Sequence, residues 1–98
     1  MKIFISMPMN GKTDKEIRRE FEKKKKYLKA QWGFNPELVI DSIVGDGITN
    51  LVKYLAKSID LMADADIVLF ASGWEYARGC RIEHEVAVAY GKAVLYEQ

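Results

Sequence analysis

The sequence predicts an α/β fold in which a small open parallel sheet is flanked by three helices. Short β-branched and aromatic runs alternate with helical patterns of ten or more residues, as is typical of parallel strands joined by right-handed crossovers. One run, Ile67–Ala71, contains five unbroken apolar residues, as expected of a central strand buried on both faces. The 98 residues leave room for one core, so residues 1–98 are expected to form a single domain.

The chain begins with a predicted strand, a loop and a long helix. Lys2–Ser6 is the strand, and Met7–Gly11 after it contains Pro and Asn-Gly turn signals. Thr13 and, three residues later, Glu16 form a capping-box pattern. A helix is therefore expected over about residues 14–31, closed by Trp32-Gly33.

The middle of the chain predicts a second strand and a second helix. Glu37–Ile40 has the pattern of a short strand, and Asp41–Asp46 is a polar loop. The next helix is expected to start near Thr49, because apolar residues then recur every three or four positions. This apolar stripe consists of Leu51, Val52, Leu55, Ile59 and Met62.

The last third of the chain predicts a strand, a loop, a helix and a final strand. The loop Ser72–Gly79 follows the apolar strand, Arg81–Tyr90 has a helical pattern with Gly91 as its C-cap, and Ala93–Tyr96 has the pattern of a fourth strand. With the first strand central, the expected order is 2-1-3-4, a flavodoxin-like topology. Ligands of such sheets bind at the carboxyl ends of the strands, here between Met7–Thr13 and Ser72–Gly79.

Composition excludes several classes of partner. Fifteen basic and fourteen acidic residues leave a net charge of +1, so no global field favours a nucleic acid polymer or an anionic membrane. One cysteine, Cys80, and one histidine, His84, exclude an internal disulfide and a multi-cysteine zinc site, and no metal or cofactor is expected. No apolar run approaches the roughly 20 residues that span a bilayer, and Met1-Lys2 leads into a strand rather than a signal peptide. A soluble protein of the reducing cytoplasm is expected.

Glu83 is the leading candidate for a catalytic group. We expect it near the start of the last helix, where the partial positive charge of the helix N-terminus favours an ionised carboxylate. An anionic carboxylate can attack an anomeric carbon or stabilise an oxocarbenium ion. The competing interpretation is an acid that only stabilises its helix.

A family resemblance rests on the segment Gly73–Glu85, which reads GWEYARGCRIEHE, and on Ala87, Ala89 and Gly91-Lys92 after it. The segment resembles the signature of a phage and prophage family of small proteins of unknown function. That family is itself similar to nucleoside 2-deoxyribosyltransferases and 2-deoxynucleoside 5-monophosphate N-glycosidases. The start of the chain, Lys2–Gly11, resembles the first strand and nucleoside-binding loop of these enzymes.

The resemblance implies roles for particular residues. Glu83 stands nine residues before Lys92, as the nucleophilic glutamate of these enzymes does before the Lys of a Gly-Lys or Asn-Lys pair. Gly79 would then lend a backbone amide to the sugar or phosphate. The first strand and loop would surround the base and sugar through Ser6, Met7, Pro8, Met9, Asn10 and Gly11.

Two positions depart from the pattern of these enzymes. Ser58 stands where they carry an aspartate, and Ala77 stands where they carry an aspartate or serine that serves base protonation or the phosphate. The acid partner is therefore missing or moved. Glu75, in the same loop as Ala77, is the natural substitute, although a loop acid beside a tryptophan is more often plain surface.

Other residues near this segment have two interpretations each. Trp74 either stacks on a nucleobase or covers the sheet edge, and Arg78 or Arg81 either holds a phosphate or is a surface charge. Three more are expected to be structural. Asp66 would hold the turn before its strand, His84 would pack or lie at an interface, and Cys80 would be a small buried residue.

Three classes of function follow. The first is an N-glycosidase or deoxyribosyltransferase that acts on a nucleoside or nucleotide through Glu83. The second is a nucleotide-binding module without turnover, favoured by Ser58 and Ala77. The third is a basic-helix interaction protein, suggested by Lys23–Lys26, although most such runs are solvated. A homodimer or higher homo-oligomer is also expected, with Tyr54, His84 and Tyr90 as contact candidates, because a small domain has a shallow crevice and the resembling enzymes complete their sites with a neighbouring subunit.

Overall fold

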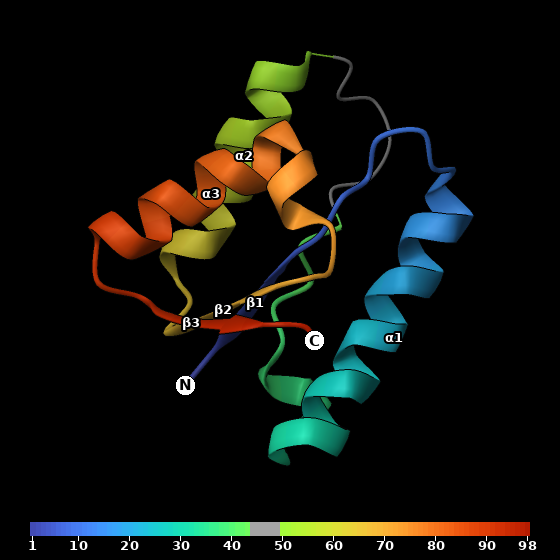
Figure 1. Ribbon diagram of the computed structural model, residues 1–98, viewed down its shortest axis with the longest axis vertical. Coiled ribbons are helices and arrows are strands. Elements are labelled where there is room, and N and C mark those ends of the chain that lie inside the picture. Colours follow the sequence, from blue (N-terminus) through green and yellow to red (C-terminus); the bar gives the residue numbers. More distant parts are fainter. Residues whose placement is uncertain (44–49) are drawn as a thin grey trace.

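The computed structural model describes residues 1–43 and 50–98 and shows a small α/β fold (Figure 1). One parallel sheet forms its centre, with helices on both faces. The elements in chain order are β1 (Ile3–Ser6), α1 (Asp14–Trp32), the 3-10 turn η1 (Pro36–Leu38), α2 (Leu51–Ala63), β2 (Ile67–Phe70), the 3-10 turn η2 (Trp74–Tyr76), α3 (Arg78–Ala89) and β3 (Ala93–Tyr96).

The sheet contains three parallel strands in the order β1-β2-β3. Ile67 of β2 pairs with Ile3 on one side and with Ala93 on the other. Val68, Leu69 and Phe70 are fully buried, because β2 is flanked by strands at both edges and covered on both faces. The expected central apolar strand is therefore confirmed.

The expected four-stranded sheet in the order 2-1-3-4 is wrong for the described residues. Within Glu37–Ile40, only Val39 forms a bridge, parallel to Ile3, and the amide of Ile40 donates to the carbonyl of Ile3 over 2.8 Å. The preceding residues turn instead, because the side chain of Asn35 accepts from the amide of Glu37 at the start of η1. The intervening Pro36 has no amide hydrogen for a ladder.

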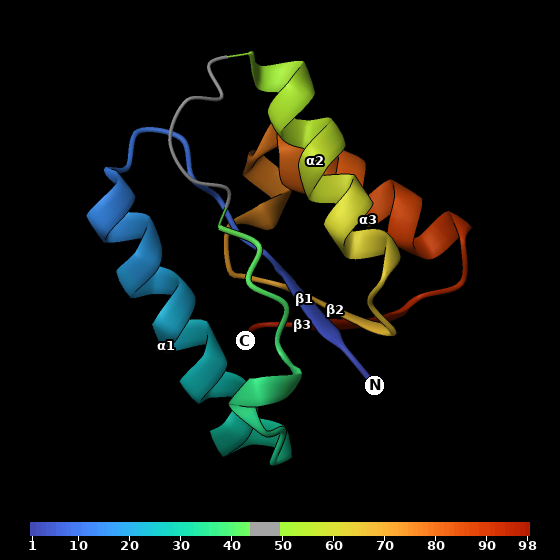
Figure 2. The same cartoon turned by 180° about the vertical axis from the view of Figure 1, so that it is seen from behind.

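Period-two alternation along the strands divides the core into two layers. Ile3, Ile5 and Leu69 pack on the α1 side, against Phe21 and Leu28. On the opposite face, Phe4, Val68 and Phe70 pack against Met62 of α2 and Ala87 of α3. Figures 1 and 2 show this arrangement from two sides, with α1 on one face of the sheet and α2 and α3 on the other.

The long first helix starts and ends as expected. Thr13 accepts from the amide of Glu16, and the Glu16 carboxylate accepts from the amide of Thr13 over 3.0 Å. This reciprocal pair satisfies two amides that the first turn would leave open. Gly33, with φ of 74°, ends the helix in a left-handed conformation that favours glycine.

The second helix is buried only along its later turns. Asn50 is its N-cap and accepts from the amides of Val52 and Lys53. The start expected near Thr49 and the second half of the predicted loop Asp41–Asp46 lie outside the described residues. Leu51 and Val52 are 69% and 76% exposed, so the predicted apolar stripe is wrong at these two positions. They precede the point where the helix reaches the sheet.

The third helix starts at Arg78, three residues before its expected start. The amide of Arg81 donates to the carbonyl of Ala77 over 3.0 Å, so Gly79 lies within the first turn. A Cβ atom at Gly79 would meet nothing nearer than Leu55 at 4.0 Å. Tyr90 is the C-cap, and Gly91, with φ of 75°, follows it. No helix in residues 1–43 and 50–98 combines the length and apolarity that a bilayer crossing needs.

Candidate functional site

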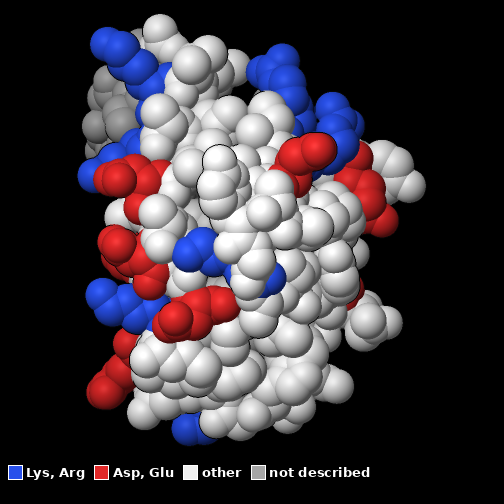
Figure 3. Space-filling view, turned by 90° about the vertical axis from the view of Figure 1, so that its left-hand side faces the viewer, with Lys and Arg blue, Asp and Glu red and all other residues white. Residues whose placement is uncertain are grey.

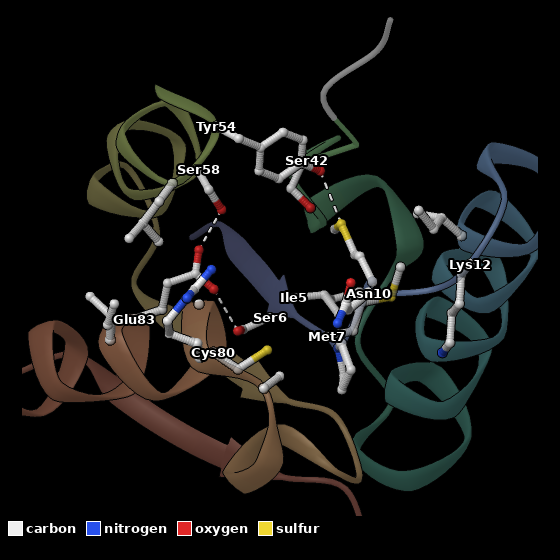
Figure 4. Close-up of a pocket in the computed structure, with 18 of the residues that line it drawn as sticks. Ile5, Ser6, Met7, Asn10, Lys12, Ser42, Tyr54, Ser58, Cys80 and Glu83 are labelled. Carbon is white, nitrogen blue, oxygen red and sulfur yellow. Dashed lines mark hydrogen bonds between the residues drawn. The ribbon is translucent and has the colours of Figure 1, made fainter. Parts of the chain in front are cut away.

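A cavity of about 910 Å³ opens beyond the carboxyl end of β1 (Figure 4). Its volume lies in the range of small-molecule sites, roughly 300–1,000 Å³. It lies where the strand-end argument placed the ligand crevice. Its walls are the loop after β1, the start of α1, Ser42-Ile43, the first two turns of α2, Gly73 and the first half of α3.

Glu83 lies in the wall of this cavity and is held by two serines. It is the sixth residue of α3 and is only 5% exposed. Ser6, at the end of β1, donates to Oε1 over 2.6 Å, and Ser58 of α2 donates to Oε2. Figure 4 shows the three side chains converging from three elements. Both oxygens of one carboxyl group are therefore oriented by the fold.

Burial raises the pKa of Glu83 above its ordinary value of 4.5, while the hydrogen bonds from Ser58 and Ser6 lower the pKa and offset part of the rise. Glu83 lies in the second turn of α3, and burial is the largest of these effects on its pKa. A carboxyl group of this kind takes part in chemistry in two forms. When ionised it is a nucleophile, and when neutral it is a proton donor.

Cys80 lies one helical turn before Glu83 and is buried. Burial raises the pKa of its thiol to about 11, although a hydrogen bond with Ser6 lowers it in part and Glu83 adds a raising charge effect. The thiol is therefore neutral at physiological pH. This confirms Cys80 as a small buried residue rather than a reactive thiolate.

Tyr54 links α2 to the loop after β1. Its hydroxyl donates to the sulfur of Met9 over 2.9 Å, and both residues line the cavity. Burial, followed by the charge of Glu83, raises the pKa of Tyr54. The expectation of Tyr54 as a surface contact is corrected, since its half-buried ring faces the cavity.

Ten of the twelve expected site residues line the cavity. Besides Glu83, they are Ser6, Met7, Pro8, Met9, Asn10, Gly11, Arg78, Gly79 and Arg81. Several further lining residues were not singled out for the site, among them Ser42, Tyr54 and Ser58 as a partner of Glu83. A side chain on α2 reveals its partner on α3 only when the two helices are packed, so local patterns carried no signal for these contacts.

Trp74 and Glu75 are the two expected site residues that do not line the cavity. The Trp74 ring stacks on His84, with centroids 4.2 Å apart, and packs against Phe70. His84 in turn shares a 2.7 Å hydrogen bond with Tyr96. Trp74 thus covers the sheet, and His84 packs as expected. The side chain of Glu75 is exposed, and only its backbone carbonyl is engaged, by Arg81.

Two charged residues near the strand ends are structural. Asp66 Oδ2 accepts from the amide of Lys2 over 2.8 Å, which fixes the start of β1 against the start of β2. Lys92 Nζ donates to the carbonyls of Ala63 and Ala65 over 2.8 and 2.7 Å. Lys92 therefore satisfies carbonyls that the end of α2 leaves open. The structural interpretation of Asp66 is confirmed.

The lysine run on α1 is largely paired with acids. Lys23 lies 3.6 Å from Glu20, and Lys25 lies 3.5 Å from Glu22. Lys24 contacts Glu20 and also Glu97, the latter over 3.0 Å. Pairs of this kind are typical of a solvated helix face, which favours that interpretation of the run.

Positive charge near the cavity comes instead from its rim. Lys12, Arg78 and Arg81 are exposed side chains in the cavity wall. The first turn of α3 also lines it, and Ala77, the N-cap, provides no side-chain hydrogen bond to the helix amides. The exposed basic side chains and the first turn of α3, which has no side-chain cap, favour an anionic group in the cavity near the start of α3. Among the described residues, no group of three or more His, Cys, Asp or Glu side chains is placed to hold a metal ion.

Comparison with known proteins assigns a family. No curated protein and no solved structure matches the chain. One family model matches residues 1–96, which is almost the whole chain. The chain therefore belongs to the family described as Domain of unknown function (DUF4406).

Proposed function

We propose that this protein cleaves or transfers the N-glycosidic bond of a nucleoside or nucleotide, with Glu83 as the nucleophile. The observation that carries the proposal is the buried carboxyl group of Glu83 in the wall of a cavity of about 910 Å³, held by Ser6 and Ser58. Perturbed carboxyl groups in clefts are candidates for catalysis on physical grounds. The resemblance of Gly73–Lys92 to nucleoside 2-deoxyribosyltransferases supports the same role.

The proposed reaction has two steps. Ionised Glu83 attacks the anomeric carbon of the sugar, the bond from that carbon to the base nitrogen breaks, and the base leaves with the bonding electrons and takes up a proton from water. The resulting ester between Glu83 and the sugar then reacts with water, which gives hydrolysis, or with a second base, which gives transfer. Ser6 and Ser58 hold the carboxylate for both steps. Glu75 has no part in this mechanism, since it does not line the cavity.

The rim charges support a substrate with a phosphate. Arg78 and Arg81 belong to the first turn of α3, and Lys12 adds a positive charge on the α1 side of the cavity. The absence of a side-chain cap at Ala77 leaves the first amides of α3 available to an anion. We therefore favour a nucleoside monophosphate over a free nucleoside, with Gly79 among the residues next to the phosphate.

A non-catalytic nucleotide-binding module is the second candidate. Ser58 stands where the resembling enzymes carry an aspartate, and Ala77 stands where they carry an aspartate or serine. Ser58 donates a hydrogen bond to Glu83 and does not provide a second carboxylate. A module of this kind would bind the same ligand in the same cavity. In both cases we place the protein in the reducing cytoplasm as a homo-oligomer.

Release of free base separates the two candidates. Native protein, Glu83→Gln and Glu85→Gln are incubated with purine and pyrimidine deoxynucleosides and their monophosphates, and free base is measured by chromatography. Glu85 is the matched control, because it is an exposed glutamate of the same helix. An enzyme releases base with the native protein and with Glu85→Gln, and Glu83→Gln lowers the rate by several orders of magnitude.

Binding is measured on the same proteins by calorimetry. Binding without release by any of the three proteins identifies the module. If neither binding nor release occurs with any nucleoside, nucleotide or nicotinamide dinucleotide, both candidates are wrong, and Glu83 is a buried structural carboxyl group.

A further inference from the structure

We propose that Ser42 selects the base of the bound nucleotide through a hydrogen bond with its hydroxyl group. The inference rests on the proposed function and adds a specificity-determining residue to the same cavity. It starts from one anomaly of the described residues, in which the Ser42 hydroxyl is the one buried side-chain polar atom without a hydrogen-bond partner.

The burial of this hydroxyl calls for a partner. Ser42 is 2% exposed, and an unpaired hydroxyl buried in protein is costly, so native structures seldom leave one unsatisfied. Ser42 also lines the cavity. A ligand in the cavity could form a hydrogen bond with this hydroxyl. Binding would then remove the free-energy cost of the unpaired hydroxyl, which raises the affinity for a ligand with a matching polar atom.

The surroundings of Ser42 define the shape of that ligand. The wall near it contains Ile43, Met9, Ile17 and the ring of Tyr54, and the Tyr54 hydroxyl already donates to Met9. Apolar and thioether side chains pack well against flat rings. A flat ring with one hydrogen-bonding edge fits this wall, and a nucleobase with a keto or amino group has this form.

Ser42 and Glu83 lie in the wall of the same cavity and come from different parts of the fold. Ser42 comes three residues after Val39, which bridges Ile3, and Ser6 comes three residues after Ile3. Neighbouring parallel segments lie about 4.8 Å apart, so the two serines follow adjacent segments at the same end of the sheet. Figure 4 shows Ser6 bonded to Glu83 and Ser42 farther toward α1. With the sugar carbon at Glu83, the cavity leaves the base the side on which Ser42 lies.

Calorimetric titration of non-reacting protein tests the assignment. Ser42→Ala is made in the Glu83→Gln background and titrated with the four common deoxynucleoside monophosphates and with 2-deoxyribose 5-phosphate, which has no base. The expected result is about tenfold weaker binding of the preferred nucleotide, as for the loss of one hydrogen bond, with unchanged binding of the sugar phosphate. Ser72→Ala is the matched control, because Ser72 is exposed and does not line the cavity, and it should change neither affinity.

Unfolding of the same variant provides a second readout. Removal of an unpaired hydroxyl leaves the midpoint of thermal unfolding unchanged or raises it, whereas removal of a bonded hydroxyl lowers it. The inference is wrong if Ser42→Ala is clearly destabilised, if it binds every nucleotide as tightly as its parent, or if it loses the sugar phosphate equally.

The inference can fail without the proposed function. Base release by native protein together with unaltered base preference in Ser42→Ala overturns the role of Ser42 alone. The absence of both nucleotide binding and base release overturns the proposed function and the inference with it.

Discussion

Ser6 donates a 2.6 Å hydrogen bond to Glu83 although 77 residues separate them. Ser6 ends β1, and Glu83 lies in the second turn of α3, so the bond joins the sheet to a helix that covers it. Ser58 of α2 binds the second carboxyl oxygen. One candidate catalytic group therefore ties three elements together, and its protonation affects the stability of the fold as well as its chemistry.

Glu83→Gln should increase the stability of the protein at neutral pH. Burial raises the folded-state pKa of Glu83 above 4.5, so the folded protein favours the protonated carboxyl group. Glu83 contributes most to the free energy of unfolding at pH values below its pKa in the unfolded protein, and this contribution is lost as pH rises through its pKa in the folded protein. The loss is about 1.4 kcal/mol for each unit by which folding raises the pKa.

Urea unfolding of native protein and Glu83→Gln from about pH 4 to about pH 8 measures this effect. The variant should gain stability relative to the native protein as pH rises. If the difference between the two proteins stays constant over this range, Glu83 is not a carboxyl group with a raised pKa.

Ser58→Ala should shift the acid limb of base release to higher pH. The hydrogen bond from Ser58 lowers the pKa of Glu83, so its removal raises that pKa further, and more hydroxide is needed to ionise the nucleophile. Rates of base release measured across pH for native protein, Ser58→Ala and Ser58→Thr report the shift. Ser58→Thr keeps the hydroxyl and should restore the native profile, whereas identical profiles for native and Ser58→Ala would show that Ser58 does not act through Glu83.

Ala77→Ser should stabilise α3 and strengthen the binding of nucleoside monophosphates. Ala77 is the N-cap of α3 and lines the cavity, and serine at an N-cap in place of alanine is worth about 1 kcal/mol. A hydroxyl there also offers a charged phosphate oxygen a hydrogen bond worth roughly 1.5–3 kcal/mol. Thermal unfolding reports the first effect and calorimetry the second. Unchanged affinity in a stabilised variant would mean that the phosphate does not reach Ala77.

Local signals in the sequence were sufficient for most elements of the fold. The capping box at Thr13 and Glu16, the glycine at 33 and the unbroken run at Ile67–Ala71 each have a local physical cause, and the structure contains the element that each predicts. The prediction of the second strand was wrong, because Glu37–Ile40 has the composition of a strand but Asn35 and Pro36 before it impose a turn.

The candidate site was predictable in position but not in its contacts. The rule that ligands bind at strand ends located the cavity, and the resemblance singled out Glu83. The orientation of Trp74 was not predictable, because an aromatic residue in a loop can face either the ligand or the sheet, and here the rings of His84 and Phe70 hold it on the sheet. The burial of Glu83 likewise depends on α2, whose packing no local pattern describes.

Trp74→Ala should destabilise the protein without weakening nucleotide binding directly. The ring packs against Phe70, His84 and Tyr96, and removal of a packed tryptophan costs about 3–5 kcal/mol when it is well buried. Because Trp74 is only partly buried, the lower part of that range is expected. Calorimetry below the unfolding transition should give the native affinity, and a nucleotide should leave Trp74 fluorescence nearly unchanged in a Trp32→Phe background. Strong quenching would place the base on Trp74 after all.

The protein should form a homodimer or a larger closed oligomer. Tyr90 is 81% exposed at the end of α3, near the exposed Val88 of the same helix. Figure 3 turns this side toward the viewer and shows uncharged surface between several Lys, Arg, Asp and Glu groups. Exposed apolar side chains such as Tyr90 and Val88 often mark an interface, and closed symmetry would let the same surface serve both copies.

Light scattering at tens of micromolar, about tenfold above a weak dimer constant, tests this expectation. Tyr90→Lys places a charge on each copy at the exposed end of α3 and should shift the population toward monomer. Tyr76→Lys is the matched control, because Tyr76 is 89% exposed but lies in η2 rather than on α3. A native protein that is strictly monomeric, or an oligomer that both variants leave intact, would show that the α3 surface is not the interface.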